Sequence, residues 1–266
     1  MTITVARLRE RYQIRSDPGN GDRGAVYRAV DRVLGDRAVV VKLLVVDGTH
    51  DARVTEQGSL HDALHQIAHL AHPNIALVTD WFTEFGRAYM VTGFVEGETL
   101  ESVMASREIS MQEAAEWIEQ MAAALEALHG LKPPVTCGVL DPSHVVIDGD
   151  GQVHLVNLGL SRLVEAAPSV NPQLMAVTEY TAPEFKGGQE GDERADIYSL
   201  GAVMYHLFTG NVPPKGRSIA VGKAVLPRPS EAHPGLPKAL EAIILRAMTV
   251  DQNGRYRSVR DLRTEL

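Results

Sequence analysis

The sequence contains a single cysteine, few aromatic residues and no long hydrophobic run. Cys137 alone excludes an internal disulfide framework, and it fits a small buried side chain in a reducing compartment. No apolar stretch reaches the roughly 18 residues of a membrane span, since Lys42 interrupts the segment 38–46. The first residues do not place an apolar core after a basic start, so they predict no signal peptide.

A clustered basic surface is also lacking. The 266 residues include 26 Lys and Arg against 34 Asp and Glu, which gives a net charge of -8 at pH 7. Binding to a nucleic-acid backbone needs clustered Lys and Arg, so we predict no nucleic-acid partner. A hydrophobic content of 44% over this length is enough for a sizeable core and for two packed lobes.

Two kinds of periodicity divide the chain. Early β-branched runs separated by turn signals predict an antiparallel sheet, and apolar residues at spacings of three and four between 57 and 72 predict one helix. Helical patterns dominate later, starting with a capping box at Ser110 and Glu113. We therefore expect an α+β fold with one lobe over residues 1–95 and a second over residues 96–266.

Motifs of one family then follow in order. The loop "GNGDRGAV" has the G-x-G-x-x-G-x-V spacing of Gly19, Gly21 and Gly24, and "VVVK" ends at Lys42. The later segments "TAPEF", "DERADIYSLG" and "NGRYRSV" supply Glu184, Asp196 and Arg255. On these motifs the chain resembles a eukaryotic-type bacterial Ser/Thr protein kinase from about residue 11 to residue 266. The resemblance implies a bilobal protein kinase-like fold, with an antiparallel sheet and one main helix in the N-lobe and a mainly α-helical C-lobe.

The catalytic loop departs from the pattern of that family. Kinases carry H-R-D-L-x-x-x-N ahead of a hairpin, and here "CGVL" begins the corresponding segment. The resemblance implies that Cys137, Gly138 and Val139 replace the histidine, the arginine and the catalytic base. A valine side chain cannot accept a proton, and general-base assistance contributes about 10²–10⁴-fold to a rate.

The phosphate and metal positions depart as well. By the same resemblance, Asp141 stands where a lysine usually steadies phosphate, and His144 stands where an asparagine binds a second magnesium ion. Asn157 replaces the metal-binding aspartate and offers a neutral oxygen where a hard cation prefers a carboxylate. The lysine-pairing glutamate is missing from the expected helix, which has Ala63 with Asp62 beside it. We therefore expect ATP and magnesium to bind weakly or not at all.

These replacements predict a pseudokinase that is not an enzyme. Its expected role is a signalling scaffold that an active Ser/Thr kinase phosphorylates on threonine and that a forkhead-associated domain then binds. Thr264 and Thr49 are the candidate phosphorylation sites, and the glycine loop with Lys42 is interpreted as vestigial. The alternatives are a nucleotide-binding switch and an atypical kinase with residual ATP-dependent activity, in which Lys42 and Asp141 have changed roles.

A vacant catalytic loop within a bacterial kinase frame is also similar to the intracellular pseudokinase domain of the mycobacterial MviN-type lipid II flippases. This resemblance implies control of peptidoglycan and cell-wall synthesis. It further implies a place on the cytoplasmic face of a membrane protein whose spans lie outside this chain.

A histidine repeat stands apart from these motifs. His61, His65 and His69 recur every four residues, and His72 follows. Neighbours at this spacing share a helix face, so a pair could chelate zinc or sense mild acid. A polar, solvent-facing stripe is the favoured interpretation, because no cysteine or carboxylate completes a tetrahedral set.

Overall fold

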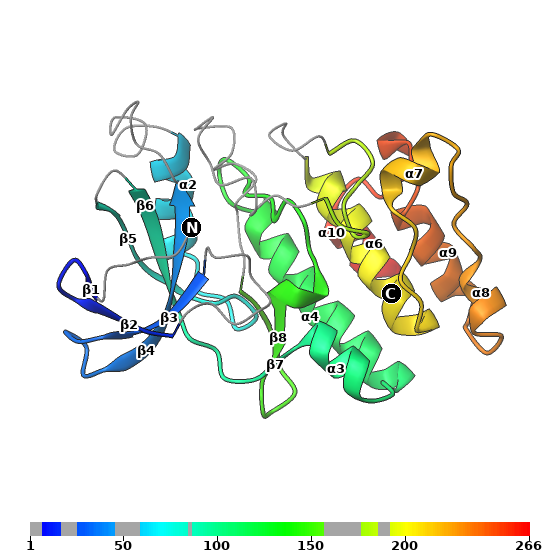
Figure 1. The fold of residues 1–266 in the computed structure, drawn as a ribbon. Helices are drawn as coiled ribbons and strands as arrows, with labels where there is room; N and C mark the ends of the chain where they lie inside the picture. The colour runs from blue at the N-terminus through cyan, green and yellow to red at the C-terminus, as the bar shows by residue number, and fades with distance from the viewer. Residues whose placement is uncertain (1–6, 17–25, 46–58, 85–86, 157–176, 186–191) are drawn as a thin grey trace.

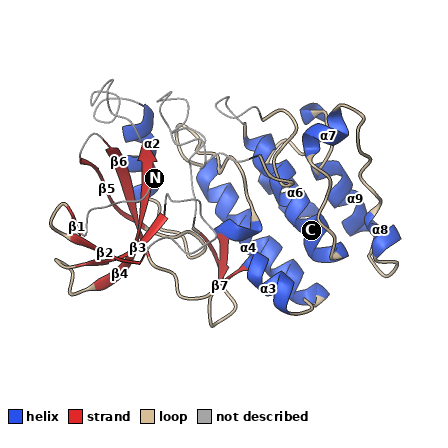
Figure 2. Cartoon of the chain, viewed as in Figure 1, coloured by secondary structure: helices blue, strands red, loops and turns tan. Residues whose placement is uncertain are grey.

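The computed structural model describes residues 7–16, 26–45, 59–84, 87–156, 177–185 and 192–266. A sheet with one helix lies at one end of the molecule and a group of helices at the other, as Figures 1 and 2 show. The predicted α+β arrangement is thereby confirmed. The first lobe contains β1 (Arg7–Leu8), β2 (Tyr12–Ser16), β3 (Val26–Asp31), β4 (Arg37–Val45), α2 (Ser59–Ala68), β5 (Val78–Glu84) and β6 (Arg87–Gly93).

The large sheet has six antiparallel strands in the order β1-β2-β3-β4-β6-β5. Alternate residues of β3 point to the interior, as the two-residue period of a strand requires. One face buries an aromatic and aliphatic cluster that includes Tyr12, Tyr27, Val41, Phe82 and Tyr89. This cluster fixes the strand register, because a shift of one residue would turn these side chains toward solvent.

Helix α2 connects the sheet to the rest of the molecule. Its Leu64 and Ile67 are buried and belong to the same core cluster as Met90 of β6 and the long helices of the second lobe. The segment 74–76 continues this connection, because Ala76 N–H donates to Leu155 O and Leu155 N–H donates to Asn74 O. The two lobes therefore share packed side chains.

The second lobe is built around two long helices. It contains β7 (Glu98–Thr99), α3 (Leu100–Ser106), α4 (Met111–His129), η1 (Pro142–His144), β8 (Val145–Ile147), β9 (Val153–Leu155), α6 (Glu193–Thr209), α7 (Gly216–Ala220), α8 (Pro229–Ala232), α9 (Lys238–Ala247), η3 (Gln252–Gly254) and α10 (Val259–Glu265). Strands β7, β8 and β9 form a small antiparallel sheet. None of the helices within the described residues is long and apolar enough to cross a membrane.

The ends of both long helices follow from their sequences. The capping box predicted at Ser110 and Glu113 is present at the start of α4, which ends at Gly130. Gly210 ends α6 with φ of 69°, a left-handed conformation that glycine adopts without strain. Gly201 lets α9 approach α6, because a Cβ there would lie 2.7 Å from Cβ of Ala247.

Candidate functional site

A cavity between the lobes lies next to Lys42. It has a volume of about 130 Å³ and is lined by Val26, Val40, Lys42, Thr92, Gly93, Phe94, Val95, Ser143, His144, Val146 and Val156. Ligand pockets of drug-sized molecules usually measure roughly 300–1,000 Å³, so this space corresponds to a planar base rather than to a whole nucleotide. Val26, Val40 and Val146 come from β3, β4 and β8, which places apolar side chains of the sheet and of the second lobe around one space.

Lys42 joins the two lobes at the polar end of this cavity. The residue is 3% exposed, and its Nζ donates a hydrogen bond to the carbonyl oxygen of Val156 beyond the end of β9. A buried ammonium group needs such oxygen partners, because burial without them is costly. The side chain of Asp62, and Asn157 itself, lie outside the described residues, as do Gly19, Gly21 and Gly24 of the glycine loop.

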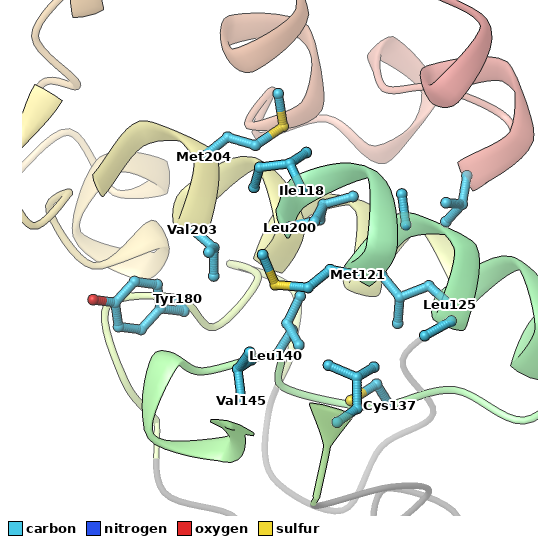
Figure 3. Close-up of a cluster of buried hydrophobic side chains, with 14 of the residues drawn as sticks. Ile118, Met121, Leu125, Cys137, Leu140, Val145, Tyr180, Leu200, Val203 and Met204 are labelled. Atoms are coloured by element: carbon cyan, nitrogen blue, oxygen red, sulfur yellow. The ribbon is translucent and has the colours of Figure 1, made fainter. Parts of the chain in front are cut away.

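The carboxylate of Asp196 in α6 holds the catalytic-loop segment through two backbone hydrogen bonds. Oδ2 of this carboxylate accepts the backbone N–H of Cys137 at 2.7 Å, and Oδ1 accepts that of Gly138 at 2.8 Å. Asp196 is fully buried, and the side chain of Cys137 lies among apolar neighbours (Figure 3). Burial raises the pKa of the Cys137 thiol well above its usual value, so this cysteine is a packing residue rather than a nucleophile.

Gly138 has a backbone reason to be glycine. Its φ is 85°, in the left-handed region where a Cβ causes strain. A residue with a side chain, such as the arginine that kinases have at this position, would be strained in this backbone conformation. Val139 follows and is half-buried, and Leu140 is buried.

We expect Gly138→Ala to lower the free energy of unfolding by about 1–2 kcal/mol, because alanine is strained at this φ and the turn also aims the N–H group at Asp196. Chemical denaturation would measure the change. Gly149→Ala is the matched control, since Gly149 is exposed and an added Cβ there meets nothing within 4 Å. Equal stabilities of the two variants would contradict the strain at Gly138.

Asp141 precedes the short helix η1, and His144 is the last residue of that helix. The carboxylate of Asp141 is the N-cap of this helix, where Oδ1 accepts the N–H of Ser143 at 3.0 Å and its hydroxyl at 2.7 Å. Asp141 is 8% exposed, whereas His144 is half-buried and lines the cavity with Lys42. The structure therefore brings His144 and Lys42 to one cavity and fixes Asp141 at its neighbouring turn.

His129 is a partner of Asp196 that the sequence patterns did not indicate. Its Nε2 lies 2.8 Å from Oδ2 of Asp196, and its Nδ1 lies 3.8 Å from Glu193. The two residues of the hydrogen bond are 67 positions apart, so no local motif could reveal the pair. Burial opposes the charged imidazole, but the hydrogen bond and the charges of Asp196, Glu193 and Asp192 outweigh it and raise the pKa of His129.

This raised pKa predicts a specific pH dependence. A histidine whose pKa is higher in the folded state adds stability below its unfolded pKa of about 6.5, and this contribution is lost as the pH rises through the folded pKa. His129→Gln should remove that part of the dependence, so the stability difference between wild type and variant should shrink from pH 6 to pH 9. Urea denaturation across this range tests the prediction, and a constant difference would contradict it.

An ion pair within the second lobe joins Arg255, whose side chain is buried, to the half-buried Glu184. Both guanidinium Nη atoms of Arg255 bind the carboxylate of Glu184, at 2.6 and 2.7 Å, and Arg255 is 3% exposed. The same guanidinium donates to three backbone carbonyls, those of Thr249, Arg194 and Val250. These contacts indicate that both residues stabilise the fold.

Arg255→Ala is expected to cost about 3–5 kcal/mol of stability, because it leaves the carboxylate of Glu184 and several carbonyls without their charged donor. Arg260→Ala is the control, since the Arg260 side chain is 82% exposed and lies 3.8 Å from its acidic partner. Thermal and urea denaturation would measure both. A loss below about 1 kcal/mol at Arg255 would contradict a structural role for the pair.

The two candidate phosphorylation sites differ in what the structure describes. Thr264 is exposed near the end of α10, and its hydroxyl donates to the carbonyl of Arg260 at 2.9 Å. Thr49 lies outside the described residues.

The fold matches that of solved kinase domains. The kinase domain of Mycobacterium tuberculosis PknI superposes with a TM-score of 0.73 at 22% sequence identity, covering 98% of this chain and 96% of that one. PpkA-294 in its apo form also gives 0.73, at 20% identity, covering 100% and 99%. At these identities the likeness establishes the fold, and it confirms the predicted bilobal kinase-like fold.

Curated relatives extend the likeness to the sequence. PrkC of Bacillus subtilis (strain 168), a serine/threonine-protein kinase, is 29% identical over 267 residues, covering 98% of this chain and 40% of that protein. The probable serine/threonine-protein kinase PknB of Lactococcus lactis subsp. lactis is 28% identical, with 97% and 42% covered. The serine/threonine-protein kinase PknA of Mycobacterium tuberculosis is 31% identical, with 94% and 59% covered. The chain thus spans about 40–60% of the length of these relatives.

The comparisons correct three of the predictions. The expected catalytically inactive scaffold and the expected absence of enzyme activity are both wrong, because relatives that match nearly the whole chain are named as serine/threonine-protein kinases. The expectation that ATP and magnesium bind weakly or not at all is also contradicted, since protein kinases use both. The physical reason is that phosphoryl transfer depends mostly on positioning and charge neutralisation, so replaced side chains in one loop do not by themselves exclude it.

The family assignment rests on the length of the match. A family model described as "Protein kinase domain" matches residues 12–247, which include most of both lobes, Lys42 and Glu184. By that match, the chain belongs to the protein kinase domain family.

Proposed function

We propose that this chain binds ATP between its lobes and acts as an atypical Ser/Thr kinase with residual phosphoryl-transfer activity. The observation that carries the proposal is the buried Lys42 at the end of an apolar, base-sized cavity. An ammonium group in a water-poor site attracts phosphate oxygens more strongly than it would in water. Membership of the protein kinase domain family supports the same reading.

The base of the nucleotide would lie between the two lobes. Val26 and Val40 of the large sheet and Val146 of β8 give the cavity apolar walls. Val40 fills more of the cavity than a smaller side chain would. We therefore propose that the purine packs between these valines and that the phosphates extend toward Lys42.

A magnesium ion bound with the nucleotide would take some of its ligands from the phosphates. Within the residues that the structure describes, no three His, Cys, Asp or Glu side chains converge on a site that could hold a metal. Magnesium is usually bound through one or two carboxylates together with substrate phosphates.

The chemistry requires a Ser or Thr hydroxyl oxygen to form a bond to the γ-phosphorus while the bond from that phosphorus to the β,γ-bridging oxygen breaks and ADP leaves. Val139 cannot take the proton of the hydroxyl, so we propose that Asp141 accepts or orients it. Its Oδ1 is fixed by the two hydrogen bonds from Ser143, and its position is therefore defined before substrate binds. The transfer is expected to be slow, since general-base catalysis normally contributes about 10²–10⁴-fold.

A second candidate function is a nucleotide-binding switch that does not turn ATP over. Val139 at the position of the base favours this alternative. Binding would then stabilise the closed arrangement of the lobes through Lys42 and Val156 without any phosphoryl transfer.

Finer features of the function are also proposals. We propose that residues 1–95 and 96–266 are the two lobes and that the chain is a kinase-like domain of a longer protein, which the greater length of its relatives supports. That protein would be similar to the MviN-type family, with membrane spans outside this chain and a role in cell-wall synthesis. An active Ser/Thr kinase would phosphorylate the exposed Thr264, and a forkhead-associated domain would bind the product.

Nucleotide binding is tested by calorimetric and thermal-shift titration with ATP in the presence and absence of Mg²⁺ and Mn²⁺. Binding to the folded state should raise the unfolding midpoint, because a ligand that binds only the native form stabilises it. Lys42→Ala should abolish the increase, whereas Lys132→Ala, at an exposed lysine, should leave it intact. No change in midpoint at millimolar ATP with either metal would contradict the proposal.

A further inference from the structure

A pair of histidines on the outer side of α2 has no part in the proposed nucleotide site. His65 and His69 are both exposed and stand four residues apart, at the last turn of the helix and just beyond it. Their ring centroids lie 4.3 Å apart with an angle of 34° between the ring planes. Two imidazoles held this close in the open are a candidate pair of metal ligands.

The hydrogen bond of His69 fixes which of its nitrogens can bind a metal. Nδ1 of His69 lies 2.6 Å from the carbonyl oxygen of His65. A carbonyl can only accept, so Nδ1 carries the proton and Nε2 of the neutral ring keeps its lone pair. Metal-ligating histidines typically donate their second ring N–H to a carbonyl or a carboxylate in this manner. The local backbone thus prepares His69 in the ligand form.

The separation of the rings agrees with chelation. Metal–nitrogen bonds of about 2.0–2.1 Å at angles of about 90–110° would place two coordinated imidazole centroids roughly 4.5–5.2 Å apart. The observed 4.3 Å is slightly shorter than this range, so the two rings would move apart when they bind a metal. Exposure of both rings leaves the remaining coordination positions to water.

Within the part of the chain that the structure describes, His65 and His69 are the two ligands of this site. His72 uses its Nδ1 in another contact, because this atom accepts the backbone N–H of Asn74 at 3.1 Å. Burial and, to a smaller extent, the charge of Arg263 lower the pKa of His72. The described residues contain no group of three His, Cys, Asp or Glu that could hold a metal, and the side chain of His61 lies outside them.

We propose that His65 and His69 form a two-imidazole site for a late first-row divalent cation, of the class of Cu²⁺, Ni²⁺ or Zn²⁺. Imidazole ligands suit these ions, and carboxylate-preferring Mg²⁺ and Ca²⁺ would not bind there. The bound ion links the last turn of α2 to the residue that follows its end at Ala68. Leu64 and Ile67 of the same helix are buried in the core, so the ion would stiffen an element that packs behind the cleft.

The test is a titration of the untagged full chain with Cu²⁺ at pH 7.5, since Cu²⁺ is the tightest-binding member of this series. Calorimetry should show one equivalent bound, and electron paramagnetic resonance should show nitrogen coordination. His65→Ala and His69→Ala should each weaken binding at least tenfold, whereas the exposed His233→Ala should not change it. Unchanged unfolding midpoints without metal would establish that the exposed substitutions leave the fold intact.

Two results would overturn the proposal. One is Cu²⁺ binding by the His65→Ala/His69→Ala double variant that equals binding by wild type, which would place the ion elsewhere. The other is affinity that does not fall between pH 7.5 and pH 5, because protonated imidazoles cannot bind a metal.

Discussion

The Val139→Asp variant is expected to transfer phosphate about 10²-fold or more faster than the wild-type chain. Val139 is half-buried between Gly138 and Leu140, at the position that the family resemblance assigns to the catalytic base. A carboxylate there could accept the proton of the substrate hydroxyl, and general-base assistance contributes about 10²–10⁴-fold. A radiolabel assay with γ-labelled ATP and a generic protein substrate would measure the rate.

The matched control is Val139→Asn, because asparagine has nearly the same shape as aspartate but cannot act as a base. Its rate should remain near that of wild type. Equal rates for the Asp and Asn variants would contradict the assignment of this position to the base, and they would leave Asp141 as the acting carboxylate.

Asp196→Ala is expected to lower the free energy of unfolding by about 3–5 kcal/mol, which is the second large effect. The fully buried carboxylate accepts the backbone N–H groups of Cys137 and Gly138 and contacts Nε2 of His129. Removing it leaves three buried donors without an acceptor, and each unsatisfied donor costs about 1–3 kcal/mol. Any phosphoryl transfer should fall as well, because the loop that contains Val139 and Asp141 loses its support.

Urea denaturation with Asp192→Ala as the control isolates this effect. Asp192 is the exposed N-cap of the same helix, and its Oδ1 accepts the N–H of Arg194 at 2.9 Å. Its loss should cost about 1 kcal/mol. Similar destabilisation by the two substitutions would argue against a special role for Asp196 in holding the catalytic loop.

Much of the fold could be predicted because its signals are local. The capping box at Ser110 and Glu113 and the glycine that ends α6 at Gly210 each act over one helical turn. Strand β2, with the sequence YQIRS, alternates Tyr12 and Ile14 with polar residues, and this local pattern predicts a strand. These features need no knowledge of distant residues.

Contacts between distant residues could not be predicted in the same way. Asp31 is 2% exposed and binds Arg11 through both carboxylate oxygens, at 2.6 and 2.9 Å, yet nothing in the sequence near either residue indicates the pair. The contact of His129 with Asp196 is similar. Which side chains are buried, and which residues pair, depends on how the whole chain packs. A pattern along the sequence does not contain this information.

The candidate site shows the limit of reasoning from residue identity. The sequence interpretation treated Gly138 as a lost arginine, whereas its φ of 85° shows that the backbone itself favours glycine. It described Asp141 as standing in the place of a phosphate-binding lysine, and the structure adds that this carboxylate caps η1. Loss of catalysis was inferred from these positions, and the kinase relatives contradict it.

The central claim is ATP-dependent phosphoryl transfer that depends on Lys42. The most direct test incubates wild type and Lys42→Ala with γ-labelled ATP and divalent metal and measures label in the chain and in a protein substrate. The account predicts slow, saturable incorporation on Ser or Thr by wild type and none by the variant. Equal incorporation by the two proteins, or none by wild type at millimolar ATP, would contradict it.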